Sequence, residues 1–155
     1  FPTADDEAAR LIKAACHLHD VSWRGHPDYR AEICFDNATR ANLGGLKHAE
    51  RVFLGLSLMH RYRNQRKGHK FENLFSLLSQ EQMRMAEILG KAMRLGAMMW
   101  VNKEETNAKL FWAPDAKALQ LVLEGDAVSL YGEVAEARLK SLARAMNASF
   151  AFQAK

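Results

Sequence analysis

Cysteines are scarce in this chain, and long hydrophobic runs are missing. The 155 residues include two cysteines, Cys16 and Cys34, which are too few for the disulfide framework of a small secreted domain. We expect both to be buried thiols in a reducing compartment, which indicates the cytoplasm. No run approaches the roughly 18 consecutive apolar residues of a membrane helix, and nothing resembles a signal peptide. The sequence therefore predicts neither a secreted scaffold nor a membrane segment.

The signatures of several enzyme classes are missing as well. No Gly-rich loop opens a helix, which excludes the phosphate-loop and dinucleotide-binding fingerprints. Two isolated cysteines cannot supply a zinc site, and there is no nucleophile elbow. The chain begins with Phe1, not Met, which suggests a piece cut from a longer protein. We therefore expect no catalytic residue in this chain.

Apolar residues recur at helical spacing through roughly the first hundred residues. The pattern predicts helices near residues 5–19, 28–38, 47–64, 71–78 and 79–101, with a turn at 42–45. The last of these helices is apolar on more than one face, which is typical of a central, buried helix.

The pattern changes after residue 102. Residues 110–112 and 118–123 predict two short strands, 131–146 a helix, and 150–152 a returning strand. We expect Phe111 and Trp112 to pack the first strand against a helix. The fold class predicted is mainly α, with a helical domain over residues 1–102 and a small β-β-α-β appendage over residues 103–155.

The first predicted helix ends in the pair His19-Asp20, which is characteristic of the HD superfamily of metal-binding domains. A metal site there also needs a His from an earlier helix and an Asp from a later one. Nothing before His17 supplies the first ligand, and residues 79–101 contain no Asp. His17 and His19 would point in nearly opposite directions on a helix. We therefore expect an HD-like domain without a metal, in which His19 lies at the core edge and Asp20 caps or pairs locally.

Positive charge is concentrated in the middle of the chain. The formal net charge is only +4, which by itself favours anionic partners weakly. Residues 51–71 contain no acidic residue, however, and include Arg51, Arg61, Arg63, Arg66, Lys67 and Lys70, together with His60 and His69. Guanidinium groups suit phosphate oxygens because their planar fork binds two at once. Two interpretations stay open: a phosphate-binding surface, or a solvated basic helix end that complements the helix dipole.

Residues 14–30 carry the most specific resemblance. Their sequence, Ala-Ala-Cys-His-Leu-His-Asp-Val-Ser-Trp-Arg-Gly-His-Pro-Asp-Tyr-Arg, resembles the HD-like region of the exopolyphosphatase/guanosine pentaphosphate phosphohydrolase family. The second half of this segment is similar to the alphaproteobacterial members. Residues 53–63 and 94–99 resemble the next helix and the long central helix of that family. The resemblance covers nearly the whole chain.

The resemblance implies a C-terminal region whose catalytic partners are N-terminal, actin-like domains of the same parent chain. Those domains would hold magnesium, and this region would need no cofactor of its own. The parent would remove phosphate from polyphosphate or guanosine pentaphosphate, while this region lines a basic channel and contributes to a homodimer contact. Position in the family implies substrate contacts at Arg24, His26, His60, Arg61 and Arg63, and the basic stretch adds Arg66, Lys67 and Lys70.

Two other functions stay open from the residues. One is an independent HD-type phosphohydrolase with a degenerate or borrowed metal site, which would release phosphate from a nucleotide. The other is a basic helical domain that binds nucleic acid or another protein. The second lacks the interleaved aromatic residues that such surfaces use, because Tyr62 is the one aromatic residue in the segment 61–70.

Overall fold

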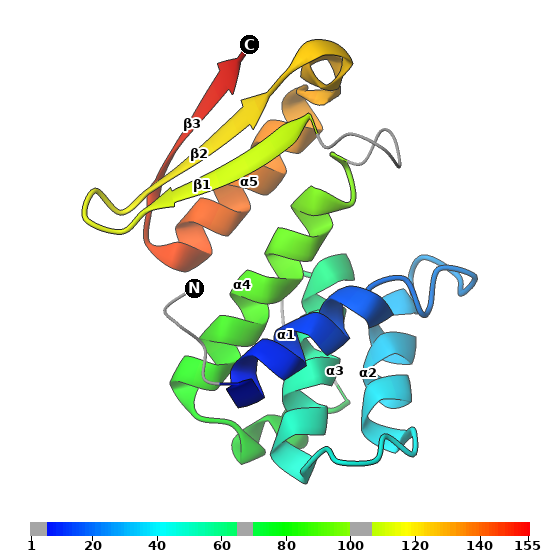
Figure 1. Ribbon diagram of the computed structural model, residues 1–155. Coiled ribbons are helices and arrows are strands. Elements are labelled where there is room, and N and C mark those ends of the chain that lie inside the picture. Colours follow the sequence, from blue (N-terminus) through cyan, green and yellow to red (C-terminus); the bar gives the residue numbers. More distant parts are fainter. Residues whose placement is uncertain (1–5, 65–69, 100–106) are drawn as a thin grey trace. The chain divides into compact units, whose positions relative to one another are not determined.

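The computed structural model describes residues 6–64, 70–99 and 107–155, and the chain divides into two compact units, Phe1–Met93 and Arg94–Lys155. The helical elements are α1 (Asp6–Leu18), α2 (Arg30–Arg40), α3 (His48–Tyr62), the 3₁₀ helix η1 (Glu72–Leu77), α4 (Gln80–Gly96), the 3₁₀ helix η2 (Gly125–Leu130) and α5 (Glu133–Met146). The strands are β1 (Ala108–Ala113), β2 (Ala118–Leu123) and β3 (Ser149–Ala154) (Figure 1).

The predicted fold class is confirmed, since helices come first and a small β-β-α-β arrangement follows them. The division between the units falls inside α4, whereas the sequence-based boundary after residue 102 lies outside the described residues. None of the described helices is long and apolar enough to cross a membrane.

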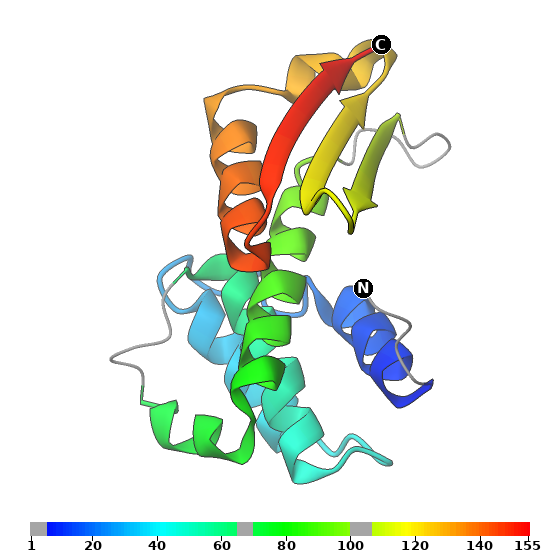
Figure 2. The same ribbon diagram turned by 90° about the vertical axis from the view of Figure 1, so that its left-hand side faces the viewer.

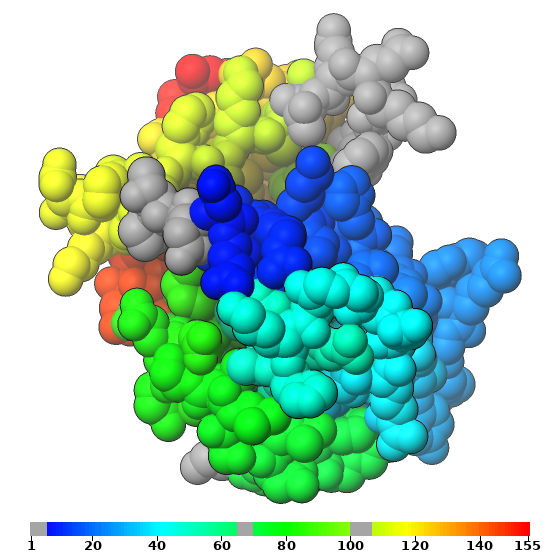
Figure 3. Space-filling model, turned by 60° about the horizontal axis from the view of Figure 1, so that its bottom comes forward, coloured from blue at the N-terminus to red at the C-terminus, as the bar shows by residue number. Residues whose placement is uncertain are grey.

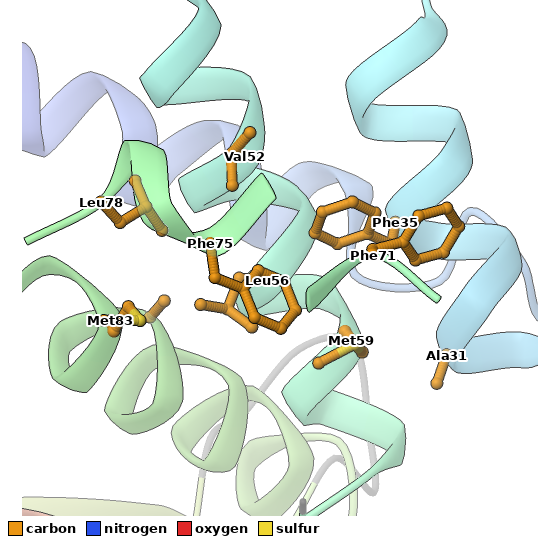
Figure 4. Close-up of a cluster of buried hydrophobic side chains, with 10 residues drawn as sticks. Ala31, Phe35, Val52, Leu56, Met59, Phe71, Phe75, Leu78 and Met83 are labelled. Carbon is orange, nitrogen blue, oxygen red and sulfur yellow. The ribbon is translucent and has the colours of Figure 1, made fainter. Parts of the chain in front are cut away.

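Aromatic packing fills the core of unit 1 between α2, α3 and η1. Phe35 stacks on Phe71 with ring centroids 4.5 Å apart and meets the edge of Phe75 at 5.7 Å (Figure 4). Such pairs add about 0.5–1.5 kcal/mol each to the stabilisation from buried area. A second buried cluster joins α1, α2, α3 and α4 through Ala15, Cys34, Ala38, Leu54, Leu58, Leu89 and Met93. The apolar stripes read from the sequence therefore meet in one helical core.

Helices α3 and α4 approach each other closely at Gly90. A Cβ atom at this position would lie 2.4 Å from the Cβ of His60 and 2.4 Å from the carbonyl oxygen of Ser57. One of these contacts is with backbone, which cannot move aside as a flexible side chain could. The crossing therefore requires glycine.

The predicted turn between α2 and α3 is held by two arginines. The Arg51 guanidinium donates to the carbonyl oxygens of Ala41, Leu43 and Leu46 at 3.2, 3.0 and 3.3 Å. Arg10 of α1 donates to the carbonyl of Gly45 and to Glu50, both at 2.9 Å. In Figure 3, α1 (dark blue) lies against this cyan segment. Arg51, counted in the basic stretch, thus satisfies backbone carbonyls and is not directed at a ligand.

Unit 2 is a three-stranded sheet with α5 against one face (Figure 2). Strand β1 pairs with β2 antiparallel, and β2 pairs with β3 parallel. The parallel pair requires a long crossover, which η2 and α5 provide. Leu119, Leu121 and Leu123 of β2 are buried beneath the helix, and Tyr131 stacks on Phe152 with ring centroids 3.6 Å apart.

Two expectations about burial were wrong. Cys16 is exposed, although Cys34 is fully buried as expected. Phe111 and Trp112 are 51% and 36% exposed, so neither is the buried core residue that the sequence suggested. The reason in unit 2 is that β1 is the outer strand, whereas α5 packs against β2 and β3. Phe111 also lies on the face of the sheet opposite α5.

Candidate functional site

The loop between α1 and α2 stands out from the helical unit (Figures 1 and 3). It carries the segment with the strongest family resemblance. Val21, Trp23 and Tyr29 are 46%, 57% and 60% exposed, and Arg24 and His26 are exposed beside them. Large exposed apolar side chains gathered in one segment are typical of a binding surface.

Arg61 ties this loop to the end of α3. Its Nε donates to the carbonyl oxygen of His19 at 2.5 Å, and its Nη2 donates to Oδ1 of Asp20. The hydroxyl of Tyr62 donates to the same carbonyl at 3.3 Å. The Arg61 side chain is 11% exposed, against 54% for Asp20. We call this arrangement the Arg61–Asp20 latch; it is a charge-assisted contact of the stronger kind.

A second anchor lies inside the loop, where it enters α2. The Ser22 hydroxyl donates to the carbonyl of Arg30 at 3.2 Å, and its Oγ lies 2.6 Å from the Sγ of Cys34. Either of these two atoms can be the donor in the contact between Ser22 and Cys34. Burial raises the pKa of the Cys34 thiol, while the Ser22 hydrogen bond acts in the opposite direction. The Arg30 Nε also donates to the carbonyl of Gly25 at 2.8 Å. The loop is thus pinned at its beginning, middle and end.

The His19-Asp20 pair takes part in these contacts rather than in a cluster of ligands. Nδ1 of His19 donates to the carbonyl of Cys16 at 2.8 Å, and its Nε2 lies 3.9 Å from Oδ2 of Asp20. Across the described residues, no group of three or more His, Cys, Asp or Glu side chains is arranged to hold a metal ion. Asp20 therefore has a local partner in His19, as the sequence suggested, and it also pairs with Arg61 of α3, 41 residues away.

Three of the predicted substrate-binding residues lie exposed on segments that the latch joins. Arg24 lies over the ring of Trp23, with its guanidinium carbon 5.2 Å from the centroid. His26 is 66% exposed, with Nδ1 3.6 Å from a carboxylate oxygen of Asp28. Arg63 is the exposed residue that ends α3. We call Arg24, His26 and Arg63 the loop–α3 surface.

The other predicted contacts are placed differently. His60 is fully buried at the α3–α4 crossing, with Nδ1 3.3 Å from the carbonyl of Arg63; this burial corrects the expectation that it faces a ligand. Arg61 is used in the latch. Lys70 pairs with Glu32 at 3.3 Å and with Asp36 at 3.9 Å. The remaining two, Arg66 and Lys67, lie outside the described residues.

Sequence reasoning missed the groups that hold the loop. Ser22 and Tyr62 lie in the segments that carry the family resemblance but were given no role, and Cys34 was read only as a small buried hydrophobe. A signal did exist for His60, which follows Leu56 at a spacing of four on the apolar stripe of α3, and both residues are fully buried. The apolar stripe predicted that His60 is buried, whereas its position in the family predicted contact with substrate. The structure agrees with the prediction from the stripe.

The match to known proteins extends through both units. The model of the family described as exopolyphosphatase, C-terminal, matches residues 3–152, which includes the loop–α3 surface, strands β1 and β2, and the first part of β3. A search of the curated proteins gave no match. The chain therefore belongs to the family of exopolyphosphatase C-terminal regions and is part of an exopolyphosphatase.

Proposed function

We propose that this chain holds polyphosphate for catalytic domains elsewhere in the parent protein and does not hydrolyse phosphate by itself. The family supplies the substrate class. The loop–α3 surface supplies cations of the right kind, because guanidinium groups bind phosphate oxygens in a fork geometry. A chain of phosphates is a uniform polyanion, so it needs spaced positive groups on a fixed support more than it needs a closed pocket.

The observation that carries this proposal is the Arg61–Asp20 latch. It joins the loop bearing Arg24 and His26 to the end of α3, where Arg63 lies. These residues come from two stretches that are distant in the sequence, and one nearly buried guanidinium connects them. Cations on a pinned loop lose little conformational freedom when a ligand binds, so more of the interaction appears as affinity.

Several finer features belong to the same proposal. The parent would use magnesium in N-terminal domains, act in the cytoplasm, and work as a homodimer. The free thiols of Cys16 and Cys34 suit a reducing compartment. Guanosine pentaphosphate is the alternative ligand, and it shares the phosphoanhydride chemistry but adds a base and a sugar. Relatedness to the alphaproteobacterial members also stays a proposal.

The decisive test is a titration of the chain with labelled long-chain polyphosphate over a series of salt concentrations. Affinity should fall steeply as salt rises, because counterions released from the polyanion drive this type of association. Unlabelled polyphosphate and guanosine pentaphosphate should then be compared as competitors. Tighter competition by the nucleotide would reassign the surface to that ligand.

A phosphate-release assay with magnesium and with manganese should run alongside the titration. Binding without release supports a substrate-holding region. Metal-dependent release would overturn the proposal and favour an independent HD-type phosphohydrolase. Binding that is indifferent to salt would remove the electrostatic basis of the proposal.

A further inference from the structure

Strand β1 (Ala108–Ala113) lies at an edge of the sheet in unit 2. Among the described strands the order is β1-β2-β3, and β1 pairs with β2 on one side. An edge strand presents unpaired backbone N–H and C=O groups that can bind another strand. Natural edges are normally blunted by charged residues, bulges or a covering element. The centre of β1 has none of these devices.

Three consecutive large apolar residues occupy that centre. Leu110, Phe111 and Trp112 are 44%, 51% and 36% exposed. The register places Leu110 beside Leu121 and Trp112 beside Leu119, so both belong to the face on which α5 packs. Phe111 lies on the opposite face, because neighbouring residues of a strand alternate. The edge strand therefore carries exposed apolar side chains on both faces of the sheet. A monomer would expose these side chains to water.

We propose that β1 pairs antiparallel with β1 of a second copy of this chain, about a twofold axis at Phe111. This inference deepens the dimerisation proposed above by naming its surface, and it is separate from polyphosphate binding. The result is one continuous six-stranded sheet. Main-chain hydrogen bonds join the copies, as in other cases of strand addition.

This register makes the strand complementary to itself. Phe111 faces Phe111 of the second copy, and Leu110 faces Trp112, which gives aromatic and aliphatic cross-strand pairs of the favourable kind. A twofold axis perpendicular to the sheet keeps both α5 helices on one face, so Leu110 and Trp112 fill the space between them.

The ends of the strand also fit a second copy. Lys109 already lies 3.9 Å from Glu124 of its own chain; in the proposed register it faces Ala113 and lies diagonally from Asp115 of the second copy, which adds a second carboxylate near its charge. Ala108 faces Pro114, whose missing N–H ends the ladder there. Both the charge pattern and the length of the apolar run thus favour this register.

Cysteine cross-linking tests the register directly. Phe111→Cys should form a disulfide-linked dimer on mild oxidation, in a Cys16→Ser background that removes the exposed native thiol. Lys109→Cys is the matched control on the same strand. Its two copies would be offset by four residues, roughly 13 Å along the strands, which is beyond the reach of a disulfide. Equal cross-linking of both variants, or none at position 111, would overturn the proposal.

Sedimentation equilibrium provides the second measurement. The unmodified chain should associate to a dimer, and Phe111→Lys should weaken that association at least tenfold. Leu77→Lys, a change at another exposed apolar residue, should leave the dimer intact. If Phe111→Lys still dimerises, the dimer uses another surface. If the unmodified chain is monomeric, β1 does not pair with a second copy. Either result would overturn the proposal. Circular dichroism of each variant confirms folding. Salt-sensitive polyphosphate binding by Phe111→Lys would show that the two proposals succeed or fail independently.

Discussion

The guanidinium of Arg61 contacts the carboxylate of Asp20 across 41 residues of chain. The contact joins the two segments that carry most of the family resemblance, 14–30 and 53–63. Arg61 is nearly buried whereas Asp20 is half exposed, so the arginine is the less replaceable partner. A side-chain cation thus engages the Asp of the His-Asp pair, and its chief effect is to fix the loop in place.

The latch should contribute measurably to stability. Asp20→Ala should lower the free energy of unfolding by about 1 kcal/mol, since one partner is well solvated. Arg61→Met should cost about 2–3 kcal/mol, because the carbonyl of His19 also loses a charged donor. Urea unfolding measures both values. Asp28→Ala is the control: its partner His26 and Asp28 itself are 66% and 80% exposed, so little should change. Equal losses for Asp20→Ala and Asp28→Ala would show that the latch contributes nothing special.

Charge removal from the loop–α3 surface should weaken polyphosphate binding selectively. Arg24→Ala and Arg63→Ala should each reduce affinity several-fold and flatten its salt dependence, because each removes one phosphate contact. The matched control is Arg40→Ala on α2, which removes the same charge from a side chain that is 80% exposed and paired with Asp36. If all three variants lose affinity equally, polyphosphate binding depends on the net charge of the chain and not on the loop–α3 surface.

Gly90→Ala should destabilise unit 1 strongly. The new Cβ would meet Ser57 backbone and His60 Cβ at 2.4 Å, and overpacking of this kind typically costs about 1–3 kcal/mol. Gly96→Ala is the matched control on the same helix, where an added Cβ meets nothing within 4 Å. That variant should be neutral or stabilise by up to about 1 kcal/mol. Thermal melts of both would reveal the difference, and similar melting temperatures would contradict the tight crossing.

Stability should decline at alkaline pH. Burial raises the pKa of the Cys34 thiol and of the Tyr62 phenol, so the folded state favours their neutral forms. The stability linked to these groups is fully present below their unfolded pKa values, about 8.5 and about 10. It is lost as the pH rises through the higher folded values. Urea midpoints should hold steady between about pH 7 and 8 and fall above about pH 9.

Cysteine variants separate the thiol contribution from the phenol contribution. Cys34→Ala should reduce the slope just above pH 8.5, because the buried thiol no longer titrates on unfolding. Cys16→Ala should leave the slope unchanged, since Cys16 is exposed. The same slope for both variants would mean that neither thiol is linked to stability.

Local pattern was sufficient to predict most elements of this fold. The stripe on α3 and the apolar residues of β2 appeared at their proper periods, and those residues are buried. Cys16 could have been placed correctly too, because it lies beside the stripe of Ala8, Leu11, Ile12 and Ala15 and not on it. Periodicity marks one inner face of an element, but it misses helices that are covered on several sides: Leu54 and Leu58 lie off the stripe of α3 and are fully buried.

Tertiary facts could not be predicted in this way. The pairing of Arg61 with Asp20 depends on how α1, α2 and α3 pack, and no local pattern encodes that distance. The exposure of Phe111 depends on which strand lies at the edge of the sheet and which face α5 covers, and Phe111 lies at the edge on the other face. From the local sequence, Arg61 was interpreted as a phosphate ligand and Phe111 as a core residue. The structure places the first in a latch and the second at an open edge.

The unequal exposure of the two cysteines gives the chain an internal reporter of its own opening. Cys16 is open to solvent, whereas the Cys34 thiol is sealed between α2 and the pinned loop. An alkylating reagent would label the first at once and the second only during excursions that separate the loop from the helices. The difference between the two labelling rates measures how often unit 1 opens locally. The native cysteines report it, and no added probe is needed.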